Sequence, residues 1–461
     1  MKIQILENLM FRFKVLTKII GVAAVLTSLY FAGAANALAA GDYKPIKFEK
    51  ETLPNGLKVI YYVDNSAPVV STVCHYNVGS QDEDLNKTGF AHFFEHLMFE
   101  ATDAIPRATI DKYVEEAGGD LNAYTSFDQT VFHFTLPSNE LNLALWMEGQ
   151  RMRKLHVDQI GVETQRGVVS EELKMRTLNQ PYGTLLYKIC KNMFPGSGYE
   201  WPTIGSIDHI ANATIKDFKD FYDNFYQPNN ATLVVAGDFK IEDAKKSVRE
   251  YFGSYAGGNL PKRHEYILKP ITKPYRETVI DDKAPMTALF IGFQAPSLLD
   301  ADYYAMSILA SILSEGESSR LYQRLVNTDQ TAVQVEFSPF ALRRAGAMLA
   351  EAFVAQGATC DVVEAAILDE INKVVLNGVS DQELEKAKNI CETQFVFGKK
   401  DLLSIAQELA KDEVFFGDAG VVNTELSKYM AVSKEDISRV AKKYLATDNR
   451  VVLIYQPKDN Q

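Results

Sequence analysis

The stretch Gly89-Phe90-Ala91-His92-Phe93-Phe94-Glu95-His96-Leu97-Met98-Phe99 contains a His-x-x-Glu-His pattern. On an α-helix, a spacing of four residues places His92 and His96 on one face, about one turn apart. Two neutral imidazoles held in this way supply half of a tetrahedral zinc site. Glu95 directly precedes His96, so we expect its carboxylate to reach a water at the same metal without being a ligand. The pattern therefore predicts a helix that carries a metal centre.

The alternative is that both histidines are structural residues of a helix whose apolar positions, Phe90, Phe94 and Leu97, belong to a core. This alternative leaves two imidazoles and a carboxylate inside an apolar run, where unpaired polar groups are costly to bury. The order His-x-x-Glu-His is also the inverted zincin signature, the reverse of His-Glu-x-x-His. We therefore favour the metal site.

The composition of the chain indicates a globular protein of more than one domain. It has 461 residues, of which 46% are apolar and 23% charged, and a formal net charge of −12. No block of Lys and Arg of the kind that follows phosphates is present in the sequence, so we do not expect nucleic acid as a partner. Cys74, Cys190, Cys360 and Cys391 match no zinc-binding spacing, and the sequence leaves open whether they form disulfides.

Residues 1–39 have the features of a secretory signal peptide. Arg12, Lys14 and Lys18 precede the apolar run 19–35, and Ala37-Leu38-Ala39 provides a small-residue cleavage site. The alternative is a membrane anchor that stays uncleaved, but the run is short and rich in Ala and Gly for that role. We therefore expect a periplasmic or otherwise exported protein, which would contact a membrane only through an uncleaved signal segment.

The rest of the chain reads as two similar halves. Strand and helix patterns fill residues 40–256, and a Gly- and Pro-containing stretch then interrupts all periodicity, which indicates a linker at residues 257–277. The same order of elements recurs in residues 278–461. We predict an α+β fold of two homologous halves, each a mostly antiparallel sheet with helices packed on one face.

A repeated helix start supports this duplication. Thr214 and Ser433 each provide an N-cap hydroxyl with Asp three residues later, and each is followed after sixteen residues by Asn and an apolar strand pattern. Helix–strand units can look alike without common origin, but the shared spacing makes duplication the better explanation.

A catalytic zinc needs a third protein ligand and an open position for water. The helical segment 165–173 offers two candidates, Glu171 and Glu172. Val168, Val169 and Leu173 would be its packed positions, so Glu172 points nearer the core than a solvated carboxylate would. Because a helical glutamate is usually an exposed charge, the residues by themselves leave the choice between the two open.

On these residues the sequence resembles the family of pitrilysin and mitochondrial processing peptidase, which are inverted zincins. The resemblance covers essentially the whole chain after the signal segment, and it rests on residues 89–99, 118–125, 166–173 and 318–325. It implies a zinc metalloendopeptidase that hydrolyses peptides or short unfolded segments by a zinc-activated water.

The same resemblance implies a role for individual residues. One zinc per chain would be bound by His92, His96 and Glu172, with Glu95 as the general base. Asn122, Ala123 and Thr125 would lie on an edge strand that receives the substrate peptide. The physics agrees, because a sheet edge offers unpaired N–H and C=O groups that an extended peptide can complete. The alternative is an ordinary edge strand protected by its neighbours.

Two departures from the family pattern affect this interpretation. Gln165 stands where many members carry a second glutamate, so its support of the metal ligands as an outer-sphere residue would lack a charge. Val326 and Val333 stand where active members use an Arg and a Tyr to bind the substrate backbone and support the tetrahedral intermediate. Loss of one such donor typically lowers the rate by about 10²–10³.

The valines suggest a partner. We expect a homologous subunit that carries the Arg/Tyr pair, in a heterodimer, and a homodimer is the less favoured arrangement. Two other functions stay open: a catalytically silent processing scaffold of the same fold, and a module that binds peptides without cleaving them.

Overall fold

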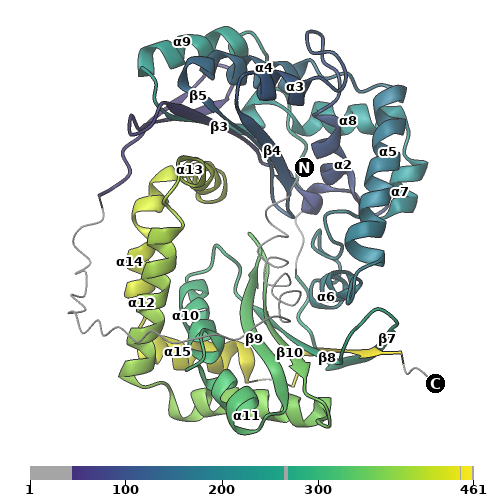
Figure 1. The fold of residues 1–461 in the computed structure, drawn as a ribbon, viewed down its shortest axis with the longest axis vertical. Coiled ribbons are helices and arrows are strands. Elements are labelled where there is room, and N and C mark those ends of the chain that lie inside the picture. Colours follow the sequence, from purple (N-terminus) through teal and green to yellow (C-terminus); the bar gives the residue numbers. More distant parts are fainter. Residues whose placement is uncertain (1–43, 264–267, 447, 459–461) are drawn as a thin grey trace, which may run out of the picture.

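The structure is a computed structural model that describes residues 44–263, 268–446 and 448–458. The predicted signal peptide, residues 1–39, lies outside the described residues. Two β-sheets, one from each half of the chain, occupy the upper and lower parts of Figure 1, and helices pack against both. The predicted α+β fold of two homologous halves is confirmed.

The elements of each half are as follows. The first-half strands are β1 (Glu49–Thr52), β2 (Lys58–Val63), β3 (Val69–Tyr76), β4 (Asp120–Thr125), β5 (Thr130–Pro137) and β6 (Ala231–Gly237). The first-half helices are α2 (Phe90–Leu97), α3 (Ile110–Glu116), α4 (Leu141–Arg153), α5 (Gln159–Leu173), α6 (Leu185–Met193), α7 (Ile207–Asn212), α8 (Ile215–Phe225) and α9 (Ile241–Phe252). The second-half strands are β7 (Tyr275–Asp281), β8 (Ala288–Ala295), β9 (Ala332–Ala341), β10 (Gly346–Val354) and β11 (Val451–Pro457). The second-half helices are α10 (Asp302–Ser314), α11 (Cys360–Asn377), α12 (Asp381–Phe397), α13 (Leu402–Phe416), α14 (Glu425–Met430) and α15 (Lys434–Val440).

The two sheets share one strand order. The first sheet runs β1-β2-β6-β3-β5-β4, and the second runs β7-β11-β8-β10-β9. Apart from the additional edge strand β1, every position of the first sheet has its counterpart in the second. In both sheets the corresponding pair is parallel, β2 with β6 and β7 with β11, while the other pairs are antiparallel. The shared order, with the same parallel pair, supports duplication of one unit.

The repeated helix starts form as predicted. Thr214 Oγ1 accepts a hydrogen bond from the N–H of Asp217 at 3.2 Å, and Ser433 Oγ accepts one from the N–H of Asp436 at 3.1 Å. Both pairs are reciprocal capping boxes, and they start α8 and α15. Each of these helices precedes the corresponding interior strand of its sheet, β6 or β11.

The linker is shorter than predicted. Strand β7 begins at Tyr275, so residues 275–277 of the predicted linker 257–277 belong to the second sheet. The reason is tertiary: Tyr275 pairs with Val451 in parallel register, and this partner lies at the far end of the chain.

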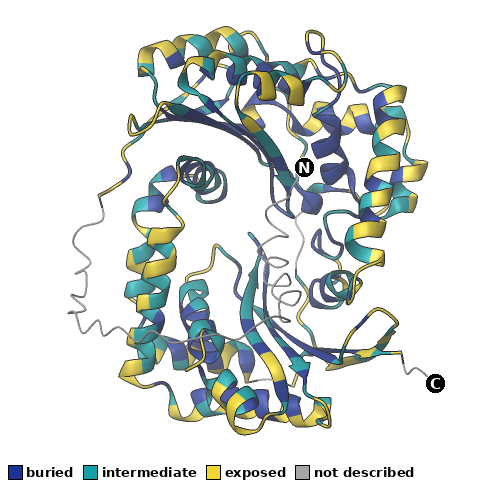
Figure 2. Ribbon diagram, in the orientation of Figure 1, coloured by how far each residue is buried: buried dark blue, intermediate teal, exposed yellow. Residues whose placement is uncertain are grey.

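Each half also contributes one helix to the sheet of the other half (Figure 1). Neighbouring residues of β3 show this, because Cys74 packs in the core that contains α2 and α8, whereas Val73 packs against α13 of the second half. The first-half helix α6 covers one face of the second sheet, and the second-half helices α10 and α11 cover its other face. The two halves are therefore interlocked, and β3, β5 and β6 are buried along most of their length (Figure 2).

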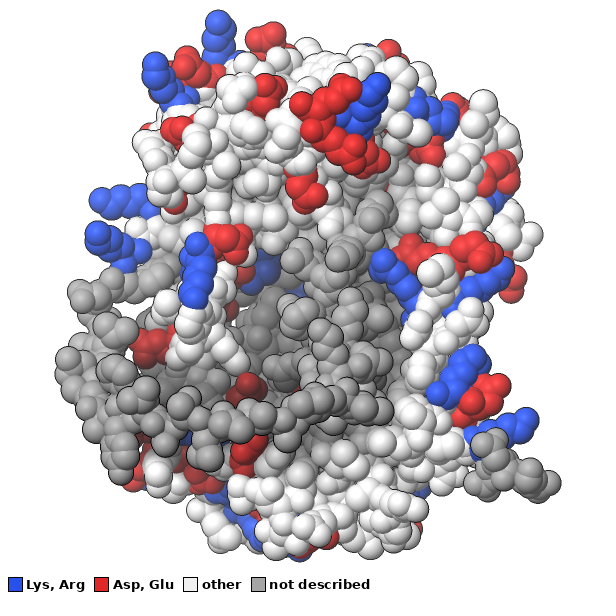
Figure 3. Space-filling view, viewed as in Figure 1, with Lys and Arg blue, Asp and Glu red and all other residues white. Residues whose placement is uncertain are grey.

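Three further features complete the description. All four cysteines are free thiols, and Cys74 and Cys190 are buried. Among the described residues, no helix combines the length and apolar character needed to cross a bilayer. On the face drawn in Figure 3, Lys and Arg side chains lie among Asp and Glu rather than in a single patch.

Candidate metal centre

The N-terminus of helix α2 is capped by a glycine and a buried carboxylate. Gly89 caps it with a φ of +94°, and a Cβ there would lie 2.7 Å from the carbonyl oxygen of Ile204, so this position requires glycine. The buried carboxylate of Glu83 accepts hydrogen bonds from the N–H groups of Gly89 and Ala91, both at 2.8 Å, and from Nε1–H of Trp201 at 2.9 Å. A carboxylate here satisfies free N–H groups and complements the helix dipole.

An aromatic cluster holds α2 against α8. Phe90 and Phe93 stack on Phe218 with ring centroids 4.8 and 4.7 Å apart, and every residue of α2 is buried. His92 and His96 form an edge-to-face pair whose centroids are 4.9 Å apart. The predicted helix with two adjacent imidazoles is confirmed.

The third member of the site comes from α5. Oε1 of Glu172 lies 3.7 Å from Nε2 of His92, and Oε2 lies 3.1 Å from Nε2 of His96. One potential ligand atom from each of the three residues falls within 4.8 Å of the others. Glu171 instead is largely exposed and forms an ion pair with Lys174 at 2.7 Å. The structure thus brings Glu172, rather than Glu171, to the histidines.

The chemistry of these side chains fits a zinc ion. Both carboxylate oxygens of Glu95 are buried without a hydrogen-bond partner among the described residues, and the buried Nε2 of His96 has Oε2 of Glu172 3.1 Å away but forms no hydrogen bond to any described residue. Buried polar groups in folded proteins are nearly always paired, so these atoms mark a place that a further group completes. Two imidazoles and one carboxylate are a common protein ligand set of catalytic zinc.

Electrostatics favour a cation beside Glu172. Burial alone would lower the pKa of His92, but the nearby carboxylates of Glu172 and Glu95 outweigh burial and raise it. Burial opposes ionisation of Glu172 as well, yet His92 and His96 hold the pKa of this carboxyl well below its usual range. The carboxylate is therefore kept ionised next to two nitrogen donors.

The predicted substrate strand is an edge strand. β4 ends the first sheet, pairs with β5 on one side, and contacts α2. Asn122 Oδ1 accepts a hydrogen bond from the N–H of Ala123 at 2.9 Å, and Oγ1 of Thr125 is buried without a partner among the described residues. The structure places Asn122, Ala123 and Thr125 on the one strand of this edge, close to the helix of the metal centre.

Gln165 contacts the segment that follows α2. Its side-chain amide donates a hydrogen bond to Oε1 of Glu100 at 2.7 Å, and Glu100 follows α2 in the chain. Gln165 therefore reaches the site through Glu100 rather than through a histidine. The displacement is axial, because seven residues are almost two full turns and so place Gln165 on the same face of α5 as Glu172, but about 10 Å along the helix axis, beside the end of α2.

Arg176 is a site residue that the sequence interpretation missed. It lies in the π-helical segment η4 (Lys174–Leu178) that continues α5, and its Nη1 lies 3.1 Å from Oε1 of Glu172. Its spacing of four residues from Glu172 was the available signal, since such pairs share a helix face. π-Helical segments occur frequently at functional sites.

The two valines lie in the second half. Val333 is on β9, the edge strand of the second sheet, and is 56% exposed, while Val326 is partly buried against the second-half core. β9 occupies the position in its sheet that β4 occupies in the first. Neither valine carries a hydrogen-bond donor in its side chain.

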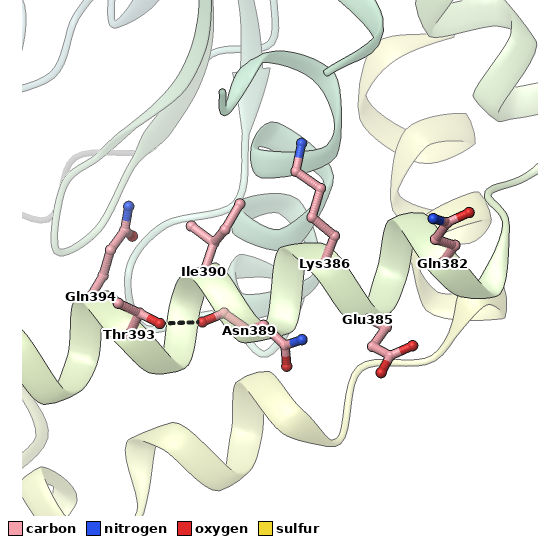
Figure 4. Close-up of a pocket in the computed structure, with 7 residues that line it drawn as sticks. All are labelled: Gln382, Glu385, Lys386, Asn389, Ile390, Thr393 and Gln394. Atoms are coloured by element: carbon pink, nitrogen blue, oxygen red, sulfur yellow. Dashed lines mark hydrogen bonds between the residues drawn. The ribbon is translucent and has the colours of Figure 1, made fainter. Parts of the chain in front are cut away.

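A separate hollow of about 660 Å³ follows one side of α12 (Figure 4). Lys386, which lines it, donates to the carbonyl oxygen of Glu315 at 3.0 Å and to Oγ of Ser318 at 2.8 Å. The residues of the metal centre are absent from its lining. This hollow is therefore distinct from the candidate centre.

Comparison with known proteins gives consistent matches. The family model described as Insulinase (Peptidase family M16) matches residues 58–204, and the one described as Peptidase M16 inactive domain matches residues 212–391. The chain is 28% identical over 448 residues to the zinc protease PqqE of Helicobacter pylori, which covers 95% of this chain and 98% of that protein. The first of these matches contains His92, His96 and Glu172.

Solved structures share the fold. The crystal structure of a protease from Helicobacter pylori has a TM-score of 0.83 and 27% identity, covering 90% of this chain and 100% of that one. The first half of the periplasmic protease PqqL from Escherichia coli has a TM-score of 0.76 and 19% identity, covering 90% and 92%. The second likeness concerns the fold alone.

Proposed function

The chain belongs to the M16 family of peptidases, and from this premise we propose that it is an exported zinc metalloendopeptidase subunit acting on peptides or short unfolded segments. One observation carries the proposal: His92, His96 and Glu172 converge from two helices, and the unpaired carboxylate of Glu95 adjoins them in the chain. The similarity to a zinc protease supports the choice of metal. The signal-like residues 1–39 support export.

In this proposal each side chain has one task. His92, His96 and Glu172 hold the zinc, which when bound acts as a Lewis acid for the scissile carbonyl and for water. Glu95 accepts a proton from the attacking water and delivers it to the nitrogen of the departing amine. Its burial without a competing hydrogen-bond donor among the described residues leaves the carboxylate available for both transfers.

The substrate would bind along β4. An extended peptide can add a strand at this edge, and main-chain hydrogen bonds would then hold it without regard to most side chains. Asn122, Ala123 and Thr125 are the positions that we assign to this contact. The Asn122 side chain already accepts the N–H of Ala123, so peptide binding would have to compete with this bond.

A homologous partner subunit would complete the site. Val326 and Val333 cannot donate hydrogen bonds to a substrate backbone or to a tetrahedral intermediate. We therefore infer a heterodimer in which the partner supplies an Arg and a Tyr. The same valines favour the second candidate function, a catalytically silent subunit that binds peptides but does not cleave them.

Glu95→Gln tests the proposal most directly, because it removes the base and keeps the size of the side chain. We expect the parent chain with its partner to cleave an unstructured peptide, and E95Q to bind one zinc per chain without cleavage. Elemental analysis measures the metal, and mass spectrometry distinguishes intact from cut peptide. Glu171→Gln changes an exposed carboxylate of the same helix and should keep both properties.

The outcomes separate the candidates. Cleavage by E95Q at the parent rate refutes the role of Glu95. Stoichiometric zinc without cleavage, in the presence of a partner that carries the Arg/Tyr pair, supports the silent subunit. Full activity of the purified single chain contradicts the heterodimer and leaves the peptidase assignment intact.

A further inference from the structure

A chain of polar contacts joins the two helices that carry the metal-binding residues. Gln165, on α5, donates to Oε1 of Glu100 at 2.7 Å, and Arg107 donates to the other oxygen of Glu100. Nη2 of Arg107 also contacts both carboxylate oxygens of Asp158, at 3.0 and 2.9 Å. Asp158 in turn caps α5 by accepting a hydrogen bond from the N–H of Gly161 at 2.9 Å. These contacts form a continuous series from the end of α2 to the first turn of α5.

The position of this link allows it to control the geometry of the site. Glu100 is 5% exposed, and its N–H bonds to the carbonyl oxygen of Leu97, the last residue of α2. Gln165 is two turns before Glu172 on α5. The link therefore fixes how far α5 stands from α2, and this separation sets the distance from Glu172 to His92 and His96.

The link also explains why an amide occupies position 165. Oε2 of Glu100 is engaged by Arg107, and Oε1 faces the side chain of Gln165. A donor is needed there, because a second carboxylate would face the first inside a largely buried contact, where like charges repel strongly.

We propose that Gln165, Glu100, Arg107 and Asp158 form a positioning network that sets the geometry of the metal centre. Gln165 and Glu100 are positioning residues, since they touch the ligating residues only through the helices that carry them. The inference rests on the proposed metal site, and its readout is metal affinity, so it does not require peptidase activity.

The test is an exchange of the two side chains. We compare the zinc dissociation constants of the full chain and of the variants Gln165→Glu, Glu100→Gln and the double variant E100Q/Q165E, by competition with a chromogenic chelator. Q165E should weaken zinc binding by about 10–100-fold, as loss of an outer-sphere partner typically does. In the double variant, the amide of the glutamine at position 100 can donate a hydrogen bond to the carboxylate of the glutamate at position 165. This variant should therefore recover most of the zinc affinity.

Gln159→Glu is the matched control. Gln159 lies on the same helix and donates to Oε1 of Glu163 at 2.7 Å, but both residues are exposed. The same change of charge at this position should leave the zinc dissociation constant within about twofold of the parent, because exposed charges are screened by water.

Two further measurements keep the outcome decisive. If Q165E does not fold, Gln165→Met removes the donor without adding a charge and should weaken zinc binding several-fold. The visible absorption of the Co²⁺-loaded variants reports ligand geometry and should change in Q165E and return in the double variant. Parent affinity in folded Q165E, or a double variant no better than Q165E, overturns the network. If instead the parent chain binds no zinc, the proposed metal site fails and not the network alone.

Discussion

Oε2 of Glu172 lies 3.1 Å from Nε2 of His96, although α5 and α2 are separated in the chain by two helices and two strands of the first sheet. This contact decides which of two adjacent glutamates faces the histidines. It also shows that the candidate centre is a property of helix packing, because neither helix by itself carries three ligands.

The first prediction concerns these adjacent glutamates. Glu172→Ala should lower bound zinc from one per chain to well under half after dialysis, because it removes a ligand. Glu171→Ala should leave the zinc content unchanged, since Glu171 pairs with Lys174 at the surface. Elemental analysis measures the zinc content of both variants. Loss of zinc in the Glu171 variant but not in the Glu172 variant would make Glu171 the third ligand.

The second prediction concerns Arg176. Its guanidinium contacts Oε1 of Glu172 and so orients the carboxylate toward the histidines. Arg176→Met should weaken zinc binding by about tenfold, the lower end for loss of an outer-sphere partner. Any loss of cleavage should then be reversed by excess zinc. Activity that stays low when zinc saturates the variant would show that Arg176 acts on substrate instead.

The third prediction concerns the start of α2. Glu83→Gln replaces an acceptor of three N–H donors with a side chain that has one acceptor oxygen. We expect it to lower the free energy of unfolding by about 1–3 kcal/mol, the cost of leaving buried donors unpaired. Denaturant titration measures the change. The exposed Glu115→Gln on α3 is the control and should stay within about 0.5 kcal/mol of the parent.

The fourth prediction concerns acid stability. Burial, reinforced by the charge of Arg151, lowers the pKa of His133 from 6.5 to about 4. As the pH falls through 6.5, the unfolded chain takes up a proton that the folded chain does not bind until about pH 4. This residue should therefore cost stability over that interval, on the order of 3 kcal/mol in total.

His133→Gln tests this directly, because glutamine does not titrate. The variant should unfold with a similar free energy to the parent near pH 8 and should lose less stability between pH 6.5 and 4. Unfolding free energies measured across that range give the comparison. Parallel curves for the two proteins would mean that His133 is protonated equally in both states.

Several features could be predicted from the sequence because they are local. The spacing of His92 and His96 sets them on one helix face whatever surrounds the helix, and the capping boxes at Thr214 and Ser433 involve residues three apart. The two halves could be recognised for the same reason, since repeated local patterns reveal duplication. The contact between Gln165 and Glu100 could not be predicted from local patterns, because the two residues lie on different segments of the chain.

The sequence by itself determined the helix that carries His92 and His96, the division into two similar halves and the absence of donor groups at Val326 and Val333. Tertiary structure decided that Glu172 and not Glu171 meets the histidines, that Arg176 and Glu100 support the site, and that α6 and α13 cover the opposite halves. The physical reason is the distance along the chain over which each interaction acts. Backbone hydrogen bonds and side-chain spacing act within a few residues, whereas burial of apolar faces selects among partners anywhere in the chain.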